Sequence, residues 1–446
     1  MSTFVDRPRY TCALGGAVGT LRAIPRAIPI IHASAGCGGN ISTALNAGAS
    51  YLGGGYCGGL ALPSSNVVER DIVFGGESRL REQIQASLEI LEGDLFVVLT
   101  GCMVDMIGDD TVSVVAEFKN AEKPVIAVPT PSFKGNAFTG YELLLKGLIT
   151  SYIPQSKVKD PLSVNVLGIV PAQDVFWKGN LREIKRLLER LGLKVNTFFG
   201  EGETLDNFKQ AGRASLTLVV SPTFGIDAAK HFQEVHGIPY LLTPFPIGAL
   251  AGEVFLKTVA DALSIDPQHT AQVIKTEKSI YYDYFERIAD IYNDVDLQRY
   301  AIVVGDSNYA PALTRFLSDE LGWLPELVVV TDLLDTHQQK SIHAQFTGFN
   351  SGLSPSVYFG SNTTSVKKYF REVWPQNRNK RYYDPFSPGV IIGSTFEREL
   401  AQEFGFPLVP VSFPMTGRCV MNRAYTGFTG GLSLTEDIIS YLVAGR

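Results

Sequence analysis

The chain has 446 residues, of which 45% are hydrophobic and 19% are charged, the composition of an ordinary globular protein. Its formal net charge of −6 and its pI near 5.6 argue against a nucleic-acid or anionic-membrane partner, because both favour a basic face. No stretch reaches the roughly 20 apolar residues of a membrane helix, and no basic amino-terminal region precedes an apolar run, so we expect a cytoplasmic protein.

Glycine-rich runs interrupt the first third of the chain, which indicates tight turns or a close approach of the backbone to something bulky. Between these runs, short apolar segments indicate strands, and amphipathic stretches indicate helices. Strands are expected at residues 28–32, 95–100 and 124–128, and helices at about 78–91 and 141–150.

From residue 163 onward, strands and helices alternate regularly, as in a parallel sheet with helices on its faces. The strands are expected at 163–170, 194–199, 216–221 and 238–243, with helices after Asn180, which is expected to cap its helix, and at about 226–236 and 250–263. A long amphipathic stretch at about 271–292 is predicted to be a connecting helix.

The alternation restarts at Arg299, with strands expected at 300–304, 327–331, 356–360, 390–392 and 408–411. The sequence therefore predicts an α/β fold of three units in series, each a mostly parallel sheet flanked by helices. We place the domain boundaries so that the first domain spans 1–158, the middle domain with its connecting helix 159–295, and the last domain 296–446.

Five cysteines lie far apart, at positions 12, 37, 57, 102 and 419. An odd number at such spacings is not a disulfide framework, and no CxxC pair signals a zinc ribbon or a ferredoxin-type cluster. Cys12, Cys37 and Cys102 each stand beside glycine or alanine. Glycine-flanked thiolates on short loops suit an iron-sulfur cluster, because its inorganic core fills the space of neighbouring side chains. The alternative is three unrelated buried thiols.

Cys102 follows the predicted strand at 95–100, and the carboxyl end of a strand is where open α/β sheets place ligands. Three thiolates fall short of the four that a cubane cluster normally takes, so a cluster here needs an unusual fourth ligand or a second chain. Ser132 is a candidate oxygen ligand, and otherwise a turn residue. Cys57 is a further ligand or a loop thiol, and Cys419 is expected to be inert.

Nucleotide-binding motifs are missing from the sequence. It contains no Walker-type phosphate loop, and no G-x-G-x-x-G run follows the strand at 300–304, so neither ATP hydrolysis nor dinucleotide binding is supported. His32 either lines a site or is a hydrogen-bonded core residue. Asp109 and Asp110 are assigned to capping the helix that follows them.

Five blocks, in order and suitably spaced, resemble the motifs of nitrogenase component 1, the large catalytic component of nitrogenase and its relatives. They are Cys12–Ala17, Ile31–Cys37, Asp71–Glu77, Thr100–Cys102 with Ile107–Asp110, and Thr130–Phe133 with Gly140 and Tyr141. The similarity continues through Thr243–Gly248 and Tyr425–Gly431. The loop at Thr130–Phe133 and the terminal block are most similar to the β-type subunit of the α/β pair.

The resemblance implies three Rossmann-like domains and an α2β2 assembly with an α-type partner. It also implies that Cys12, Cys37 and Cys102 supply half the ligands of a P-cluster-type 8Fe-7S centre at the α/β boundary, with a 4Fe-4S cluster as the alternative. Ser132 matches the family serine that can approach this cluster. If each of two chains contributes three thiolates, the presence of only three candidate cysteine ligands in this chain is explained.

In the family, an ATP-hydrolysing iron protein sends electrons through this cluster to an active-site cluster in the α-type subunit, where a Cys and a His hold it. The middle domain here has no cysteine, and the last domain offers only Cys419, with Asn422 near the expected place of the histidine. The resemblance therefore implies an oxidoreductase subunit that relays electrons and supports its partner.

Two departures from nitrogenase β-type chains bear on the substrate. Gly38–Ser42 replaces the usual aromatic and arginine residues after the second cysteine, and the loop Gly53–Gly59 is foreign to the nitrogenases. Both favour a reductase outside nitrogen fixation, with methylthio-alkanes and C–S bond cleavage as the leading hypothesis. The alternatives are a true nitrogenase β subunit, a non-catalytic scaffold for cofactor assembly, and a small-molecule-binding protein with metal-free thiols.

Overall fold

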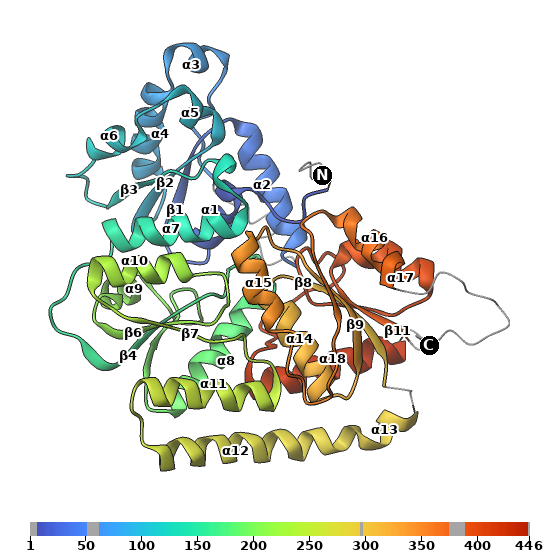
Figure 1. The fold of residues 1–446 in the computed structure, drawn as a ribbon. Helices are drawn as coiled ribbons and strands as arrows, with labels where there is room; N and C mark the ends of the chain where they lie inside the picture. Colours follow the sequence, from blue (N-terminus) through green and yellow to red (C-terminus); the bar gives the residue numbers. More distant parts are fainter. Residues whose placement is uncertain (1–6, 51–61, 295–297, 374–388, 445–446) are drawn as a thin grey trace.

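The computed structural model describes residues 7–50, 62–294, 298–373 and 389–444. Figure 1 shows three β-sheets, one after another along the chain, each flanked by helices, and every strand pair within them is parallel. The predicted α/β fold of three parallel sheets is confirmed. In the described part of the chain, no helix combines the length and the hydropathy that crossing a membrane requires.

The N-terminal sheet has the strand order β1-β2-β3 and is covered on both faces. Its strands are β1 (Ala27–His32), β2 (Leu95–Thr100) and β3 (Val125–Val128). Phe96 and Val98 of β2 pack toward α4 (Glu77–Ile90) and α6 (Thr111–Ala116), whereas Val97 and Leu99 join the core that contains α1 (Ala13–Leu21) and α7 (Ala137–Ser151). Because both faces are buried, β2 is a continuous apolar run.

Helices α1 and α7 approach each other through glycine. A Cβ atom on Gly16 would lie 1.9 Å from the carbonyl oxygen of Ala137, and one on Gly140 would lie 1.9 Å from that of Ala13. The backbone approach that this glycine content predicts is therefore, at these two positions, an approach to a neighbouring helix. Three more helices of this part are α2 (Ala35–Gly48), α3 (Glu69–Phe74) and α5 (Cys102–Ile107).

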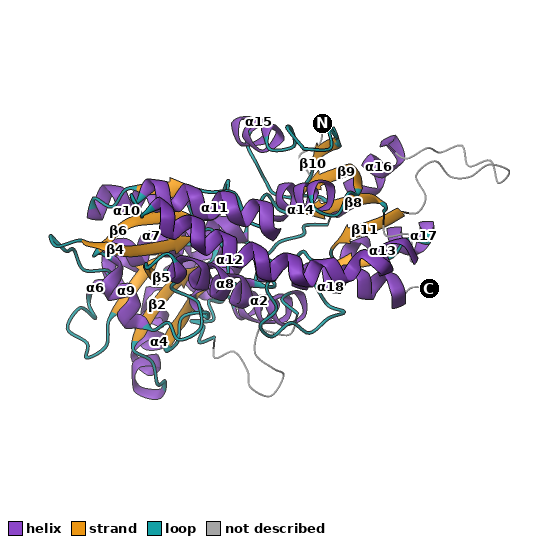
Figure 2. Ribbon diagram, turned by 90° about the horizontal axis from the view of Figure 1, so that it is seen from below, coloured by secondary structure: helices purple, strands orange, loops and turns teal. Residues whose placement is uncertain are grey.

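The middle sheet has the order β5-β4-β6-β7. Its strands are β4 (Asp160–Leu167), β5 (Lys194–Asn196), β6 (Ala214–Val219) and β7 (Tyr240–Leu242), and its helices are α8 (Trp177–Arg190), α9 (Leu205–Ala211), α10 (Ile226–His236) and α11 (Gly248–Ala262). The connecting helix is α12 (Pro267–Phe285), followed by the turn η2 (Glu286–Ile288) and α13 (Ala289–Asp294). Figure 2 shows α12 running from the middle sheet toward the C-terminal one.

The sequence predicted that Asn180 caps its helix, and this is wrong, because α8 already begins at Trp177. Its buried amide instead joins segments that are far apart in sequence. The amide nitrogen donates to Asp174 and to the hydroxyl of Tyr309, both at 2.8 Å, and the amide oxygen accepts the N–H of Tyr425 at 2.7 Å. A hydrogen-bonded polar network thus joins the middle and the C-terminal parts of the chain.

The C-terminal sheet has the order β10-β9-β8-β11-β12. Its strands are β8 (Tyr300–Gly305), β9 (Leu324–Val330), β10 (Ser356–Phe359), β11 (Gly389–Gly393) and β12 (Leu408–Pro410), and its helices are α14 (Tyr309–Asp319), α15 (Thr336–Ala344), α16 (Thr363–Val373), α17 (Arg398–Phe404) and α18 (Gly427–Ala444). Helix α18 packs on α8, α11 and α12 of the preceding part. The domain boundaries proposed from the sequence stay a prediction.

The segment just before α1 is anchored in the C-terminal part. Arg9 forms a bidentate ion pair with Glu397, at 2.6 and 3.2 Å, and both side chains are 1% exposed. The hydroxyl of Tyr10 hydrogen-bonds that of Thr331 at 2.7 Å, and its ring packs against Phe138 at a centroid distance of 4.8 Å. We call residues 7–12 the N-terminal strap.

Two buried carboxyl groups lie close to Tyr10. Asp306 accepts the N–H groups of Asn308 and Tyr309, at 3.0 and 2.9 Å, and Asp332 accepts the N–H of Ser307 at 2.8 Å. Burial raises the pKa of both carboxyl groups, and the charge of Asp332 further raises the pKa of Asp306. The pair therefore retains a proton at pH values where an exposed aspartate is ionised.

Replacing Glu397 by glutamine tests the anchor of the strap. Glu397→Gln leaves the buried guanidinium of Arg9 without its counter-charge, and we expect a loss of about 3 kcal/mol in the free energy of unfolding, measured by urea denaturation. Glu117→Gln, the same change in an exposed pair with Arg81, is the matched control and should have little effect. Equal effects of the two substitutions would contradict the anchoring role.

Replacing Asp332 by asparagine tests the buried carboxyl pair. Because its folded-state pKa is raised, stability is full at low pH and is lost as the pH rises through that pKa. Between about pH 5 and about pH 8, we expect the Tm of the unmodified protein to fall more steeply than that of Asp332→Asn. Asp261→Asn, on the exposed side of α11, is the control and should keep the original slope. Parallel slopes for Asp332→Asn and the unmodified protein would refute the assignment.

Candidate iron-sulfur site

The three candidate cysteines all stand at helix starts in the N-terminal part. Cys12 is the N-cap residue of α1, Cys37 is the third residue of α2, and Cys102 is the first residue of α5. The sequence predicted glycine-rich loops here, and the structure corrects this. The free N–H groups at the starts of α1 and α2 favour negative charge, which suits thiolates.

The parallel sheet explains how residues so distant in sequence reach one edge. His32 and Thr100 are paired at the carboxyl ends of β1 and β2, and α2 and α5 begin just beyond them. Cys12 is held by the loop that follows β3: it forms a backbone bridge with Asn136, and the N–H of Ala13 donates to the carbonyl of Gly135 at 3.2 Å. Each cysteine therefore lies beside the end of a different strand or its loop.

The contacts around the sulfur atoms show which groups come together. The N–H of Ser132 donates to Cys102 Sγ at 3.3 Å, and its hydroxyl also contacts this sulfur. The hydroxyl of Ser34 lies 3.6 Å from Cys37 Sγ. Burial raises the pKa of Cys12, and the nearby thiols of Cys102 and Cys37 raise it further. The three thiols are thus close enough to interact electrostatically, and Ser132 lies beside Cys102.

The described residues do not form a site for a single metal ion. In the described residues, no group of three or more His, Cys, Asp or Glu side chains is arranged to hold one metal ion. One tetrahedral ion with bonds of about 2.3 Å holds its sulfur ligands roughly 3.8 Å apart, whereas in a cluster each thiolate binds its own iron. Beside Cys37, a Cβ atom on Gly38 or Gly39 would meet nothing within 4 Å. These free thiols with open space beside them fit an iron-sulfur cluster.

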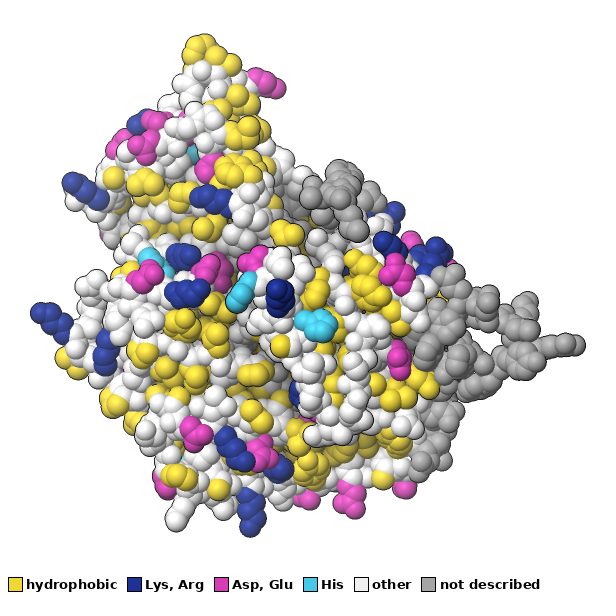
Figure 3. Space-filling view, in the orientation of Figure 1, with side chains coloured by type: hydrophobic (Ala, Val, Ile, Leu, Met, Phe, Trp, Pro, Cys, Tyr) yellow, Lys and Arg dark blue, Asp and Glu magenta, His cyan; other side chains and the backbone are white. Residues whose placement is uncertain are grey.

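Large apolar side chains are exposed on the elements that carry or flank the cysteines. They are Phe74 of α3 (81% exposed), Met106 of α5 (76%) and Phe133 (63%) of the turn η1 (Ser132–Lys134). Figure 3 shows hydrophobic side chains over the end of the molecule where α3 lies. Because α3 contacts α5 and Ser132 contacts Cys102 of α5, these side chains lie on neighbouring elements and are available to a partner surface. We call these three residues the apolar rim.

Two predictions about polar residues near the site are decided by the structure. His32 is a core residue: its Nδ1 lies 2.8 Å from the hydroxyl of Ser65, and its Nε2 lies 3.0 Å from Asp109. Asp110 caps α6 as expected, by accepting the N–H of Ser113 at 3.0 Å. Asp109 does not cap that helix; it accepts the N–H of Gly76 at 3.0 Å, at the start of α4.

The other cysteines contribute nothing to this geometry. Cys57 and the loop Gly53–Gly59 lie outside the described residues. Cys419 is exposed and unpaired, in the segment between β12 and α18. Sequence reasoning missed Ser34 and the N-terminal strap. The serine before a helix start carried a local signal, but the partners of Arg9 and Tyr10 lie hundreds of residues away and left none.

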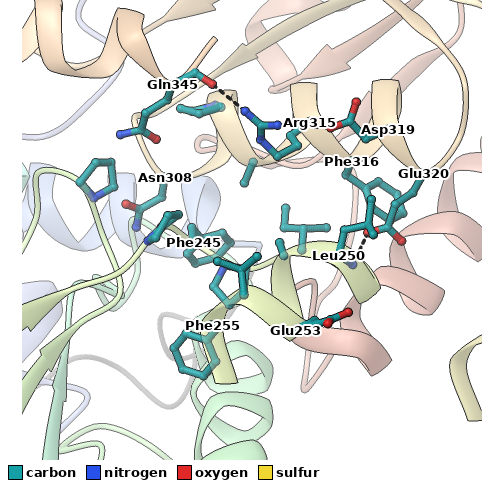
Figure 4. Close-up of a pocket in the computed structure, with 18 of the residues that line it drawn as sticks. Phe245, Leu250, Glu253, Phe255, Asn308, Arg315, Phe316, Asp319, Glu320 and Gln345 are labelled. Atoms are coloured by element: carbon teal, nitrogen blue, oxygen red, sulfur yellow. Dashed lines mark hydrogen bonds and ion pairs between the residues drawn. The ribbon is translucent and has the colours of Figure 1, made fainter. Parts of the chain in front are cut away.

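An apolar pocket of about 490 Å³ lies elsewhere, between α11 and α14 (Figure 4). Its walls include Phe245, Leu250 and Phe316, and its charged groups are engaged with the protein itself. Arg315 binds Asp319 at 3.2 Å, and Glu320 accepts the N–H of Leu250 at 3.0 Å. The pocket therefore offers apolar surface without a free charge to orient a polar ligand.

Comparison with known proteins identifies the family. The sequence matches the family model described as Nitrogenase component 1 type Oxidoreductase over residues 12–442. The chain belongs to this family. It is 26% identical to the nitrogenase molybdenum-iron protein beta chain of Bradyrhizobium diazoefficiens, over 97% of this chain and 83% of that one. The corresponding beta chain of Methanococcus maripaludis is 23% identical, over 99% and 95%.

A solved structure supports the same fold for this nitrogenase component 1 chain. Nitrogenase Cp1 at pH 6.5 superposes with a TM-score of 0.79 at 22% identity, covering 100% of this chain and 94% of the other. Because its similar relatives are beta chains, this chain is a β-type member of the family. Members are oxidoreductases that bind iron-sulfur clusters, and family β chains form a tetramer with an α subunit and receive electrons from an iron protein.

The groups at the site suit the binding of iron. In the described part of the chain, the side chains that contact the sulfur atoms of Cys37 and Cys102 are the hydroxyls of Ser34 and Ser132. Thiolates hold iron, and serine hydroxyls donate hydrogen bonds to sulfur or coordinate iron through oxygen.

Proposed function

We propose that this chain is the β-type subunit of a nitrogenase-like, two-component, ATP-dependent reductase. Cys12, Cys37 and Cys102 supply its half of a P-cluster-type 8Fe-7S centre shared with an α-type chain in an α2β2 complex, and Ser132 is a further group at that cluster. The observation that carries the proposal is the arrival of three free thiols at one edge of the N-terminal sheet, with open space beside Cys37.

The same geometry supports sharing between chains. The three cysteines are partly buried, and the apolar rim is exposed. One side of the site is therefore available for contact with a partner chain. Three thiolates also satisfy only part of a multi-iron cluster. When bound, the cluster supplies one-electron storage. The chain's own residues hold it, exclude water on one side and fix its position through helix starts that rest on a rigid sheet.

The absence of a second cluster from this chain is the second part of the proposal. We infer that the active-site cluster belongs to the α-type partner, because the middle domain has no cysteine and the last domain offers only Cys419, which is exposed. An ATP-hydrolysing iron protein supplies the electrons, and this chain passes them on. We place the complex in the cytoplasm, where ATP is available and thiols stay reduced.

Single cysteine substitutions test the cluster assignment. In the anaerobically purified α/β complex, we expect Cys102→Ala to remove the electron paramagnetic resonance signal of the relay cluster and to lower the iron and sulfide content, because one iron loses its ligand. Cys419→Ala makes the same chemical change at an exposed site and should leave both unchanged. An unaltered spectrum in Cys102→Ala, with the complex intact, would reject the proposal. Iron content per α/β pair separates an 8Fe-7S from a 4Fe-4S cluster.

The most specific part of the proposal is the substrate. We propose that the complex reduces methylthio-alkanes. The supporting observation is Gly38–Ser42, which follows Cys37 within α2 and contains none of the aromatic and arginine residues that nitrogenase β-type chains usually carry there. We expect the complex, supplied with its iron protein and ATP, to reduce a methylated sulfide to a thiol and an alkane faster than it reduces N2 to ammonia. Ammonia as the main product would indicate a nitrogenase, and no steady turnover would indicate a cofactor-assembly scaffold.

A further inference from the structure

A second cavity, of about 710 Å³, lies where the three parts of the chain meet. It is lined by the ends of α1 and α2, by the start of α8, by the loop after β5 and by the segment before α18. Its volume falls within the range of small-molecule sites. Its lining differs from that of the apolar pocket in Figure 4, because three cationic side chains line it: Arg22, Lys178 and Arg182.

Arg22 is a cation in this cavity whose guanidinium has no partner among the described residues. Its guanidinium lines the cavity and is partly buried, and in the described residues it makes no hydrogen bond and no ion pair. Burial lowers its pKa to about 10, and no neighbouring charge raises it again. Other arginines that are withdrawn from water bind carboxylates: Arg9 binds Glu397, and Arg186 binds Glu277 at 2.7 Å. A charge that is partly withdrawn from water and has no protein partner favours the binding of an anion.

The surrounding residues indicate what kind of anion fits. The ammonium of Lys178 lies 5.3 Å above the ring of Trp177, and Arg182 donates to the carbonyl of Asn422 at 3.1 Å, so both cations are held at the wall. Trp177 and Phe199 contribute buried aromatic surface to the lining. Glu201 is the one carboxylate among the lining residues, so positive charge prevails.

Backbone strain marks the same place. Ala172 lines the cavity with φ at 65°, in the left-handed region that disfavours residues with a Cβ atom. Such strain persists where the surrounding structure enforces it, and it concentrates at binding and catalytic sites. The unpaired cation and the strained wall are independent observations, and both lie in one cavity.

We propose that this cavity binds a small organic anion that carries carboxylate or phosphate groups. Arg22 binds the charged end, Lys178 and Arg182 add attraction at the mouth, and Trp177 and Phe199 contact the body of the molecule. The ligand touches all three parts of the chain at once, so its binding stabilises their arrangement. The proposal is independent of the iron-sulfur assignment, because no cysteine lines the cavity.

The test is isothermal titration of the purified complex with two probes, citrate and inorganic phosphate, at an ionic strength held constant with sodium chloride. We expect at least one probe to bind, and Arg22→Gln to weaken that binding by about tenfold or more, since a charge-assisted hydrogen bond is lost. Lys178→Gln, an exposed change that leaves folding intact, should weaken it several-fold. Binding of citrate would show that the cavity recognises carboxylates, and binding of inorganic phosphate would show that it recognises phosphate groups.

Arg81→Gln, on α4 and outside the cavity, is the matched control and should bind the probe as the unmodified complex does. Equal loss in Arg22→Gln and Arg81→Gln would show a general charge effect and overturn the proposal. Failure of both probes to bind would also overturn the proposal. So would a fall in Tm in Arg22→Gln that is the same with and without probe, because Arg22 would then serve only to stabilise the end of α1.

Discussion

The parallel pairing of β1, β2 and β3 is the constraint on which the candidate site depends. Parallel strands point the same way, so all their carboxyl ends lie at one edge of the sheet. The register that pairs His32 with Thr100 places the starts of α2 and α5 side by side, although their cysteines are far apart in sequence. Helix α1 joins them through the loop after β3. A cluster site in this fold is therefore a consequence of strand direction.

The strands could be predicted from the sequence because each is buried on both faces and reads as a short apolar run, as Leu95–Thr100 does. Helices α1 and α2 could not, because glycine lowers helix propensity and their residues read as loops. What makes α1 a helix is its packing on α7, where Gly16 meets Ala137. Gly16 precedes the first strand of the N-terminal sheet and Ala137 follows its last strand. A local sequence pattern does not encode a contact between residues so far apart.

The candidate site shows the same division between local and distant information. Cys12, Cys37 and Cys102 were identifiable from residue type and from small neighbours, and the structure places them at one edge. Their supports were not identifiable. The ion pair between Arg9 and Glu397 joins the N-terminal strap to the C-terminal part of the chain, and neither residue stands in a motif. Asn180 is of a residue type that often caps helices, but it lies inside α8, where its amide binds Tyr309 and Tyr425 from two distant segments.

Helix α1 connects the two sites inferred here, because Cys12 is its N-cap and Arg22 its C-cap residue. The helix dipole favours negative charge at the Cys12 end and positive charge at the Arg22 end. The dipole acts only within a turn of each end, so an anion at Arg22 has little direct electrostatic effect on Cys12. Any influence must be mechanical. Since Gly16 and Gly140 leave no free space between α1 and α7, a shift of α1 would carry α7 with it, and the loop that holds Cys12 leads directly into α7.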